Sequence, residues 1–150
     1  SYHHTGPITM NYAIREALRL VLEEGLEARF DRHALASKAL QAGVEALGLS
    51  MFAQEGARTP TLNTVSIGDN IDDGAVRKSL LNDFNIEIGG GLGPVAGKAW
   101  RIGMMGHGAR QENVAYLISA LEVIFKRMGY TQKVGDASAA VTQVYAEALS

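Results

Sequence analysis

Apolar residues recur every three or four positions in five stretches of the chain, and this spacing predicts five helices. The predicted helices run from Met10 to Gly25, Leu26 to Leu47, Asp73 to Phe84, Val114 to Gly129 and Asp136 to the end of the chain. The inward-facing side chains of the last four helices are expected to include Phe30, Ala36, Leu40, Val44, Leu47, Val76, Leu80, Leu81, Phe84, Val114, Leu117, Ile118, Leu121, Phe125, Val141, Val144, Tyr145 and Leu149. Asp72 or Asp73 and Asp136 are expected to cap the helices that follow them.

Shorter stretches that are apolar or rich in β-branched residues predict four strands between these helices. The predicted strands are Leu49–Ala53, Thr61–Ile67, Ile86–Ile88 and Lys98–Gly103. Gly48 ends the second helix at little conformational cost because glycine tolerates a left-handed backbone. We therefore expect a two-layer α+β domain, with long helices packed on one side of a small, mostly antiparallel sheet.

The composition narrows the class of protein without identifying it. The 150 residues are 47% hydrophobic and 20% charged, with a net charge of −2. A chain of this charge has no basic surface for nucleic acid or an anionic membrane, and no apolar run approaches the ~20 residues that span a bilayer. Cysteine is absent, which excludes disulfides and thiolate sites and favours a cytoplasmic location.

The glycine-rich run between the third and fourth predicted strands has three interpretations. Residues Gly91 to Ala96 fit the spacing of a dinucleotide-binding fingerprint. Such a loop must open a helix whose N-terminal N–H groups receive the pyrophosphate, and here a predicted strand follows instead. The remaining interpretations are a connection between two strands and a backbone that lies close to a ligand.

Arg101 is the candidate ligand-binding residue that the pattern singles out. Along a strand, Trp100 and Ile102 point to one face while Arg101 points to the other. A guanidinium is suited to binding a carboxylate through two parallel hydrogen bonds. The alternative is a structural salt bridge within the domain.

The first residues of the chain gather polar side chains. Tyr2 and Thr5 carry hydroxyls that could donate to a phosphate, and the alternative is a frayed terminus without function. His3 and His4 are adjacent, and adjacent side chains of an extended chain point to opposite sides, so no metal site is expected. His107 follows the Arg101 strand and receives no role.

Four segments taken together identify a family resemblance. They are Tyr2–Thr5, Glu24–Glu27, Ile86–Gly93 and Arg101–Gly106, in this order and with compatible gaps. Their pattern resembles the C-terminal part of alanine–glyoxylate (serine–pyruvate) aminotransferase, a pyridoxal-phosphate enzyme of fold type I. The resemblance implies a small domain over residues 1–129 and a helical extension over residues 130–150.

The resemblance also implies roles for particular residues. Arg101 matches the arginine that binds the α-carboxylate of the amino acid or oxo acid. Tyr2 and Thr5 match residues that reach across a dimer interface to the cofactor phosphate of the partner subunit. The loop from Gly89 to Gly93 is implied to lie near the substrate entrance.

One group that is essential to the family's chemistry has no match in this chain. The family's Schiff-base lysine lies upstream of the Tyr2 segment, and none of the lysines here matches it: Lys38, Lys78, Lys98, Lys126 and Lys133. The resemblance therefore implies the C-terminal domain of a longer homodimeric enzyme, preceded by a large domain and inactive alone. The intact enzyme would use pyridoxal phosphate to move an amino group from alanine or serine to glyoxylate or a related 2-oxo acid.

Two alternative functions stay open at this point. The chain could be a stand-alone, non-catalytic α+β binding or assembly domain, in which Arg101 forms a structural pair. It could also belong to a related pyridoxal-phosphate lyase or desulfurase, because donor preference is set largely by the absent domain.

Overall fold

A computed structural model describes residues 3–131 and 133–149 of the chain. The chain divides into two compact units, Ser1–Arg32 and His33–Ser150, and the boundary falls inside helix α2 (Leu26–Ala46). The division expected from the family resemblance, at residues 129 and 130, is a different one and stays a prediction.

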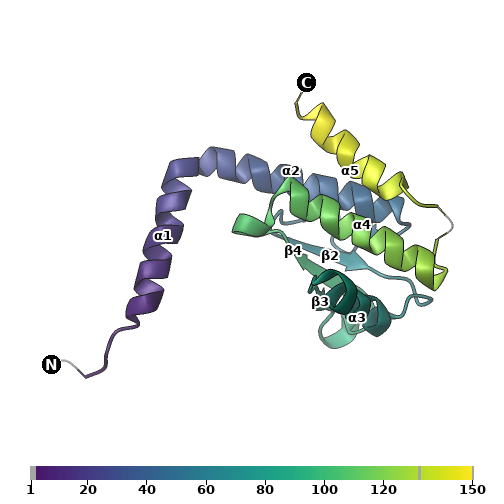
Figure 1. The fold of residues 1–150 in the computed structure, drawn as a ribbon, viewed down its shortest axis with the longest axis horizontal. Coiled ribbons are helices and arrows are strands. Elements are labelled where there is room, and N and C mark those ends of the chain that lie inside the picture. Colours follow the sequence, from purple (N-terminus) through teal and green to yellow (C-terminus); the bar gives the residue numbers. More distant parts are fainter. Residues whose placement is uncertain (1–2, 132, 150) are drawn as a thin grey trace. The chain divides into compact units, whose positions relative to one another are not determined.

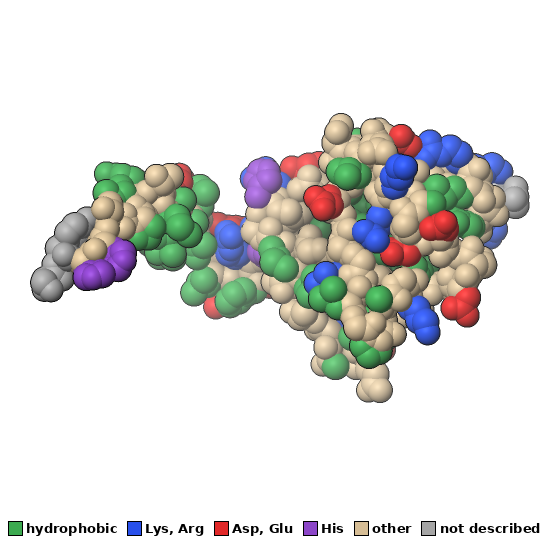
Figure 2. All heavy atoms as spheres, turned by 90° about the horizontal axis from the view of Figure 1, so that it is seen from below, with side chains coloured by type: hydrophobic (Ala, Val, Ile, Leu, Met, Phe, Trp, Pro, Cys, Tyr) green, Lys and Arg blue, Asp and Glu red, His purple; other side chains and the backbone are tan. Residues whose placement is uncertain are grey.

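The first unit contains helix α1 (Ile8–Glu24) and the first turns of α2. Gly25 separates the two helices with a φ of 84°, a left-handed value that glycine adopts readily. The Glu24 carboxylate accepts hydrogen bonds from Arg32 and Arg29, which lower its pKa to about 2. None of the residues of α1 is buried, and Figure 2 shows apolar side chains gathered along this part of the chain.

The second unit is built on an antiparallel sheet with the strand order β1-β2-β4-β3 (Figure 1). The strands are β1 (Ser50–Met51), β2 (Leu62–Ser66), β3 (Gly89–Gly90) and β4 (Ala99–Gly103). The two longest strands, β2 and β4, pair at the centre over five residues each, with Thr64 opposite Arg101. The expected α+β class, with helices on a small antiparallel sheet, is confirmed.

Helices pack over the core side of this sheet. They are the C-terminal turns of α2, α3 (Asp73–Phe84), α4 (Gln111–Met128) and α5 (Asp136–Glu147). Trp100 and Phe125 are both buried and meet edge to face, with ring centroids 6.2 Å apart. A Cβ at Gly43 of α2 would lie 2.8 Å from the Ile118 side chain, so a glycine there allows α2 and α4 to approach closely.

Two of the predicted helix boundaries depend on capping groups. The Asp72 carboxylate accepts a hydrogen bond from the Ala75 N–H, which confirms an N-terminal cap for α3. Asp136 does not cap α5, contrary to the prediction, because Gly135 occupies the cap position. The buried Glu122 carboxylate of α4 supplies the missing acceptor instead, since it binds the N–H groups of Gly135 and Ala137.

Two strand predictions are corrected by the hydrogen-bond pattern. The first strand is shorter than Leu49–Ala53 and comprises only Ser50–Met51. Residues Ile86 to Ile88 do not form a strand, because the Ile86 N–H bonds the Leu80 carbonyl and completes the end of α3. Pairing with β4 begins only at Gly89.

Three side chains that were predicted to face inward are exposed. Phe30 is 58% exposed because it lies in the first unit, before α2 reaches the core. Leu81 is 49% exposed because it directly follows the buried Leu80, and successive residues of a helix point in different directions. Leu149 is 89% exposed and lies beyond the last residue of α5.

Candidate functional site

Strand β4 places Arg101 on the face of the sheet opposite the core. Its neighbours Trp100 and Ile102 are buried on the helix side, and the strand alternation turns the half-buried Arg101 the other way. Arg101 stands between Thr64 on β2 and Gly89 on β3, its direct partners across the sheet. Both neighbours are small, so neither covers the guanidinium.

One nitrogen of the Arg101 guanidinium is fixed and the others are not. Its Nε donates a hydrogen bond to the Gly90 carbonyl, at 2.8 Å. Within residues 3–131 and 133–149, no carboxylate pairs with Arg101, and its Nη1 and Nη2 atoms have no hydrogen-bond acceptor. The structural salt bridge that the sequence left open is therefore not formed by the described residues.

The glycine run connects two antiparallel strands, β3 and β4, through the short 3-10 turn Gly93–Val95. No α-helix opens between Gly91 and β4, so the arrangement required for a dinucleotide site is absent from this loop. A Cβ at Gly91 would lie 1.9 Å from the Val95 carbonyl oxygen, which explains why the loop needs a glycine at its start. The prediction of a connection between two strands is confirmed.

The core side of β4 is held by a polar network centred on Asp73. The Asp73 carboxylate accepts two hydrogen bonds from Arg77, at 2.7 and 2.9 Å, and one from the indole N–H of Trp100, at 2.9 Å. The Arg77 guanidinium beside it, aided by the Trp100 N–H, holds the pKa of this carboxyl below its usual value. Trp100 is fully buried, so this network fixes the strand on which Arg101 stands.

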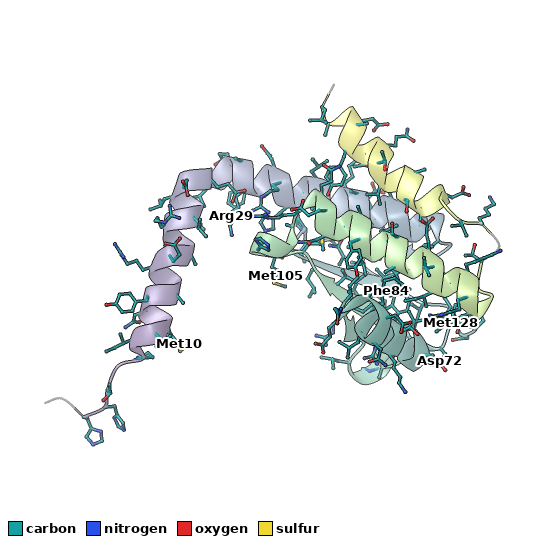
Figure 3. All side chains as sticks on the ribbon, viewed as in Figure 1. Met10, Arg29, Asp72, Phe84, Met105 and Met128 are labelled. Atoms are coloured by element: carbon teal, nitrogen blue, oxygen red, sulfur yellow. The ribbon has the colours of Figure 1, made fainter. Side chains whose placement is uncertain are left out.

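The loop after β4 is tied to α2 by a buried histidine. The Gly106 N–H donates to His33 Nε2 at 2.9 Å, so this ring nitrogen carries no proton. His107 follows in the short 3-10 turn Gly106–Gly108, and its side chain is exposed. The exposed Met105 marks this loop in Figure 3.

The candidate residues at the N-terminus belong to the first unit, whereas the sheet that carries Arg101 belongs to the second. Tyr2 lies outside the described residues. Thr5 belongs to the first unit, and its exposed hydroxyl has no hydrogen-bond partner among the described residues. His3 and His4 place their Nδ1 atoms 2.7 Å apart, contrary to the expectation that they point to opposite sides. No group of three or more potential metal ligands occurs in the described part of the chain.

Sequence reasoning identified Arg101 but missed the groups that hold it. The acceptor at Gly90 is a backbone carbonyl, which has no sequence signature. His33 receives no functional role from the sequence, although its place four positions before the buried Ser37 on α2 puts both on one helix face. The pairing of Asp73 with Arg77 follows an i, i+4 spacing that the sequence does display.

No protein-family model matches the chain, but individual relatives do. The chain is 46% identical over 146 residues to (S)-ureidoglycine–glyoxylate transaminase of Bacillus subtilis, covering 97% of this chain and 35% of that protein. It is 43% identical over 121 residues to alanine–glyoxylate aminotransferase of Callithrix jacchus, covering 80% of this chain and 29% of the relative. The chain matches the C-terminal part of the alanine–glyoxylate aminotransferase family.

Solved structures agree with this match. The crystal structure of the Bacillus subtilis ureidoglycine–glyoxylate aminotransferase superposes with a TM-score of 0.91 at 46% identity, covering 95% of this chain and 37% of that chain. Pyridoxamine–pyruvate aminotransferase from Mesorhizobium loti gives a TM-score of 0.90 at 31% identity, over 98% of this chain and 38% of that chain. The chain thus spans about a third of the length of these relatives, and the family resemblance read from the sequence is confirmed.

The relatives are aminotransferases, and the aminotransferase family implies a dependence on pyridoxal phosphate. No helix in the described part of the chain is long and apolar enough to cross a membrane.

Proposed function

We propose that this chain is the C-terminal domain of a pyridoxal-phosphate-dependent aminotransferase, in which Arg101 binds the α-carboxylate of the substrates. The main observation that supports this role is the half-buried guanidinium of Arg101. Its Nε donates a hydrogen bond to the Gly90 carbonyl, and no carboxylate among the described residues pairs with it. Its Nη1 and Nη2 atoms can then bind a carboxylate from outside the domain. The names of the relatives support glyoxylate or a related 2-oxo acid as the amino acceptor.

The residues of this chain that would contact the cofactor are few. The Thr5 hydroxyl, which has no partner among the described residues, suits a phosphate oxygen, and the resemblance assigns Tyr2 the same role across a dimer interface. When bound, pyridoxal phosphate supplies an electron sink for the substrate α-carbon. Arg101 would orient the substrate for that chemistry by fixing its carboxylate. None of the five lysines matches the Schiff-base position, so the chain alone is proposed to be inactive.

Two kinds of amino donor are compatible with the match. The family resemblance favours alanine or serine. (S)-Ureidoglycine is a second candidate, because the match to ureidoglycine–glyoxylate transaminase covers 97% of the chain, whereas the match to the Callithrix jacchus alanine–glyoxylate enzyme covers 80%. The wider match takes in helix α5, which lies in the extension over residues 130–150.

The proposed partners are an upstream large domain and a second subunit. Helix α1 presents its apolar residues without burying any of them, which supports a surface that another part of the enzyme covers. The cytoplasmic location that the cysteine-free composition favours belongs to the same proposal.

The experiment replaces Arg101 with Gln in the full-length protein that carries this segment, loaded with pyridoxal phosphate. Loss of two charge-assisted hydrogen bonds, each worth about 1.5–3 kcal/mol, is expected to weaken alanine or glyoxylate binding by at least about 100-fold. Arg110→Gln removes an exposed arginine that pairs weakly with Glu112, at 3.6 Å, and serves as the control. Cofactor uptake should be nearly unchanged in both variants. Unaltered KM and kcat/KM in Arg101→Gln would sink the assignment.

A further inference from the structure

We propose that Gly89 is a positioning residue for Arg101: the missing side chain at residue 89 lets the guanidinium lie across strand β3, where the Gly90 carbonyl fixes it. This inference rests on the proposed function, in which Arg101 binds a substrate carboxylate. Gly89 would determine where Arg101 holds that carboxylate.

The geometry around Gly89 carries the proposal. Gly89 and Arg101 are direct partners across the antiparallel β3–β4 pair. A Cβ at Gly89 would lie 3.3 Å from Arg101 Nη2, 3.4 Å from its carbonyl oxygen and 3.5 Å from its Cβ. The Arg101 side chain therefore runs directly over the space that any other residue at this position would occupy.

The two glycines that follow serve different neighbours. A Cβ at Gly90 would meet the Arg77 guanidinium at 3.3 Å, and a Cβ at Gly91 would collide with the Val95 carbonyl. Arg77 is held by Asp73 in the network that also binds Trp100, on the side of the sheet away from Arg101. Of these three glycines, Gly89 is thus the one whose missing Cβ leaves room for Arg101.

The guanidinium that lies over Gly89 has limited freedom. Its Nε is tied to the Gly90 carbonyl at 2.8 Å, so a methyl group below Nη2 can only push the outer nitrogens away from the strand by a few tenths of an ångström. Bidentate binding of a carboxylate depends on the direction of both outer nitrogens. A displacement of this size is therefore expected to weaken carboxylate binding without removing the charge.

The test compares Gly89→Ala with wild type in the full-length, cofactor-loaded protein. Propionate is used as a probe because it carries a carboxylate but no amine to react, and its inhibition constant reports carboxylate binding alone. Since a 1 Å misplacement can cost about 100-fold, a shift of a few tenths of an ångström should raise the inhibition constant and the KM for alanine about 3- to 10-fold. The kcat at saturating alanine should change less than twofold.

Gly103→Ala is the matched control. It adds the same methyl group to strand β4, and the nearest atom to that Cβ is the flexible end of Met105, at 3.7 Å. Its inhibition constant for propionate should stay within twofold of wild type. Equal effects of Gly89→Ala and Gly103→Ala would overturn the positioning role, because a general loosening of the sheet would then explain both.

A double-mutant cycle with Arg101→Lys separates the two proposals. Lysine has no Nη2 atom over residue 89, so Gly89→Ala should add less than twofold in the Arg101→Lys background. A full additional 3- to 10-fold effect there would refute the action through Arg101. If instead Arg101→Gln leaves propionate inhibition unchanged, the proposed function itself fails. A strong Arg101→Gln effect with a silent Gly89→Ala leaves the proposed function standing and rejects only the role of Gly89.

Discussion

Asp73→Ala is the substitution whose effect on stability the structure defines best. The change removes the acceptor of the indole N–H of Trp100, a side chain that is fully buried. Leaving such a donor unpaired costs about 1–3 kcal/mol. The change also removes a bidentate ion pair with the partly exposed Arg77, worth about 0.5–1 kcal/mol, and a carboxylate in the first turn of α3. We expect the free energy of unfolding to fall by about 2–4 kcal/mol.

Denaturant unfolding followed by fluorescence measures this loss, because Trp100 is the single tryptophan of the chain. Asp83→Ala is the matched control, since Asp83 lies on the same helix and pairs with Arg127 at the same 2.7 Å distance. Both partners of that pair are about half exposed, so the control should lose at most about 1 kcal/mol. Equal losses in the two variants would refute the argument that the buried indole decides the effect.

The pH dependence gives a second check on Asp73. The hydrogen bonds from Arg77 lower the pKa of this carboxyl in the folded chain, so the unfolded chain takes up its proton first as the solution is acidified. The stabilisation is therefore fully present above the ordinary aspartate pKa of about 3.9 and is lost as the pH falls through the lowered value. Wild type and Asp73→Asn should differ in stability at pH 6, and the difference should shrink as the pH falls through the lowered pKa of the Asp73 carboxyl. A constant difference over this range would contradict the assigned ion pair.

The remaining predictions concern the ends of the chain and the cofactor. Glu122→Ala should speed amide exchange over helix α5 and lower the free energy of unfolding by about 1–3 kcal/mol, because two N–H groups lose their buried acceptor. The exposed control Glu112→Ala should change neither the exchange nor the stability. The chain should self-associate in sedimentation through α1, and Leu18→Glu should weaken that association; a clean monomer at high concentration would count against it. Pyridoxal phosphate added to the chain should give no stable imine absorbance band, and a band would point to Lys98.

The sequence predicted the elements well where one local signal decided them. The stripe of α4 and the stop at Gly129 are confirmed, because spacing and a left-handed glycine act within a few residues. Residues Ile86 to Ile88 were predicted as a strand from their β-branched side chains alone. Pairing is a tertiary property, and the Ile86 N–H is already used to end α3. Asp136 failed as a cap for the same reason, since Glu122 from another helix takes that part.

The candidate site was predictable only in its charged residue. The alternation along β4 was enough to place Arg101 opposite the core, because Trp100 and Ile102 mark the buried face. Its anchor could not be found in this way, since the Gly90 carbonyl becomes a partner only through the register of β3 on β4. The glycine run carried an ambiguous signal for the same reason. Its three interpretations can be told apart only when the atoms that a Cβ at each glycine would contact are known.

The surroundings of Arg101 leave its guanidinium without a carboxylate partner among the described residues. A half-buried charge loses part of its hydration and is normally compensated by a carboxylate nearby. The chain has 16 acidic residues, yet none of those in the described ranges is placed against Arg101, whereas Arg77 on the other side of the sheet is fully paired with Asp73. Stability alone favours pairing both arginines in the same way. The difference is accounted for if the counter-charge of Arg101 comes from a bound carboxylate. Arg101→Gln, which loses only the hydrogen bond to the Gly90 carbonyl, should then destabilise the unligated domain less than Arg77→Gln, which loses the ion pair with Asp73.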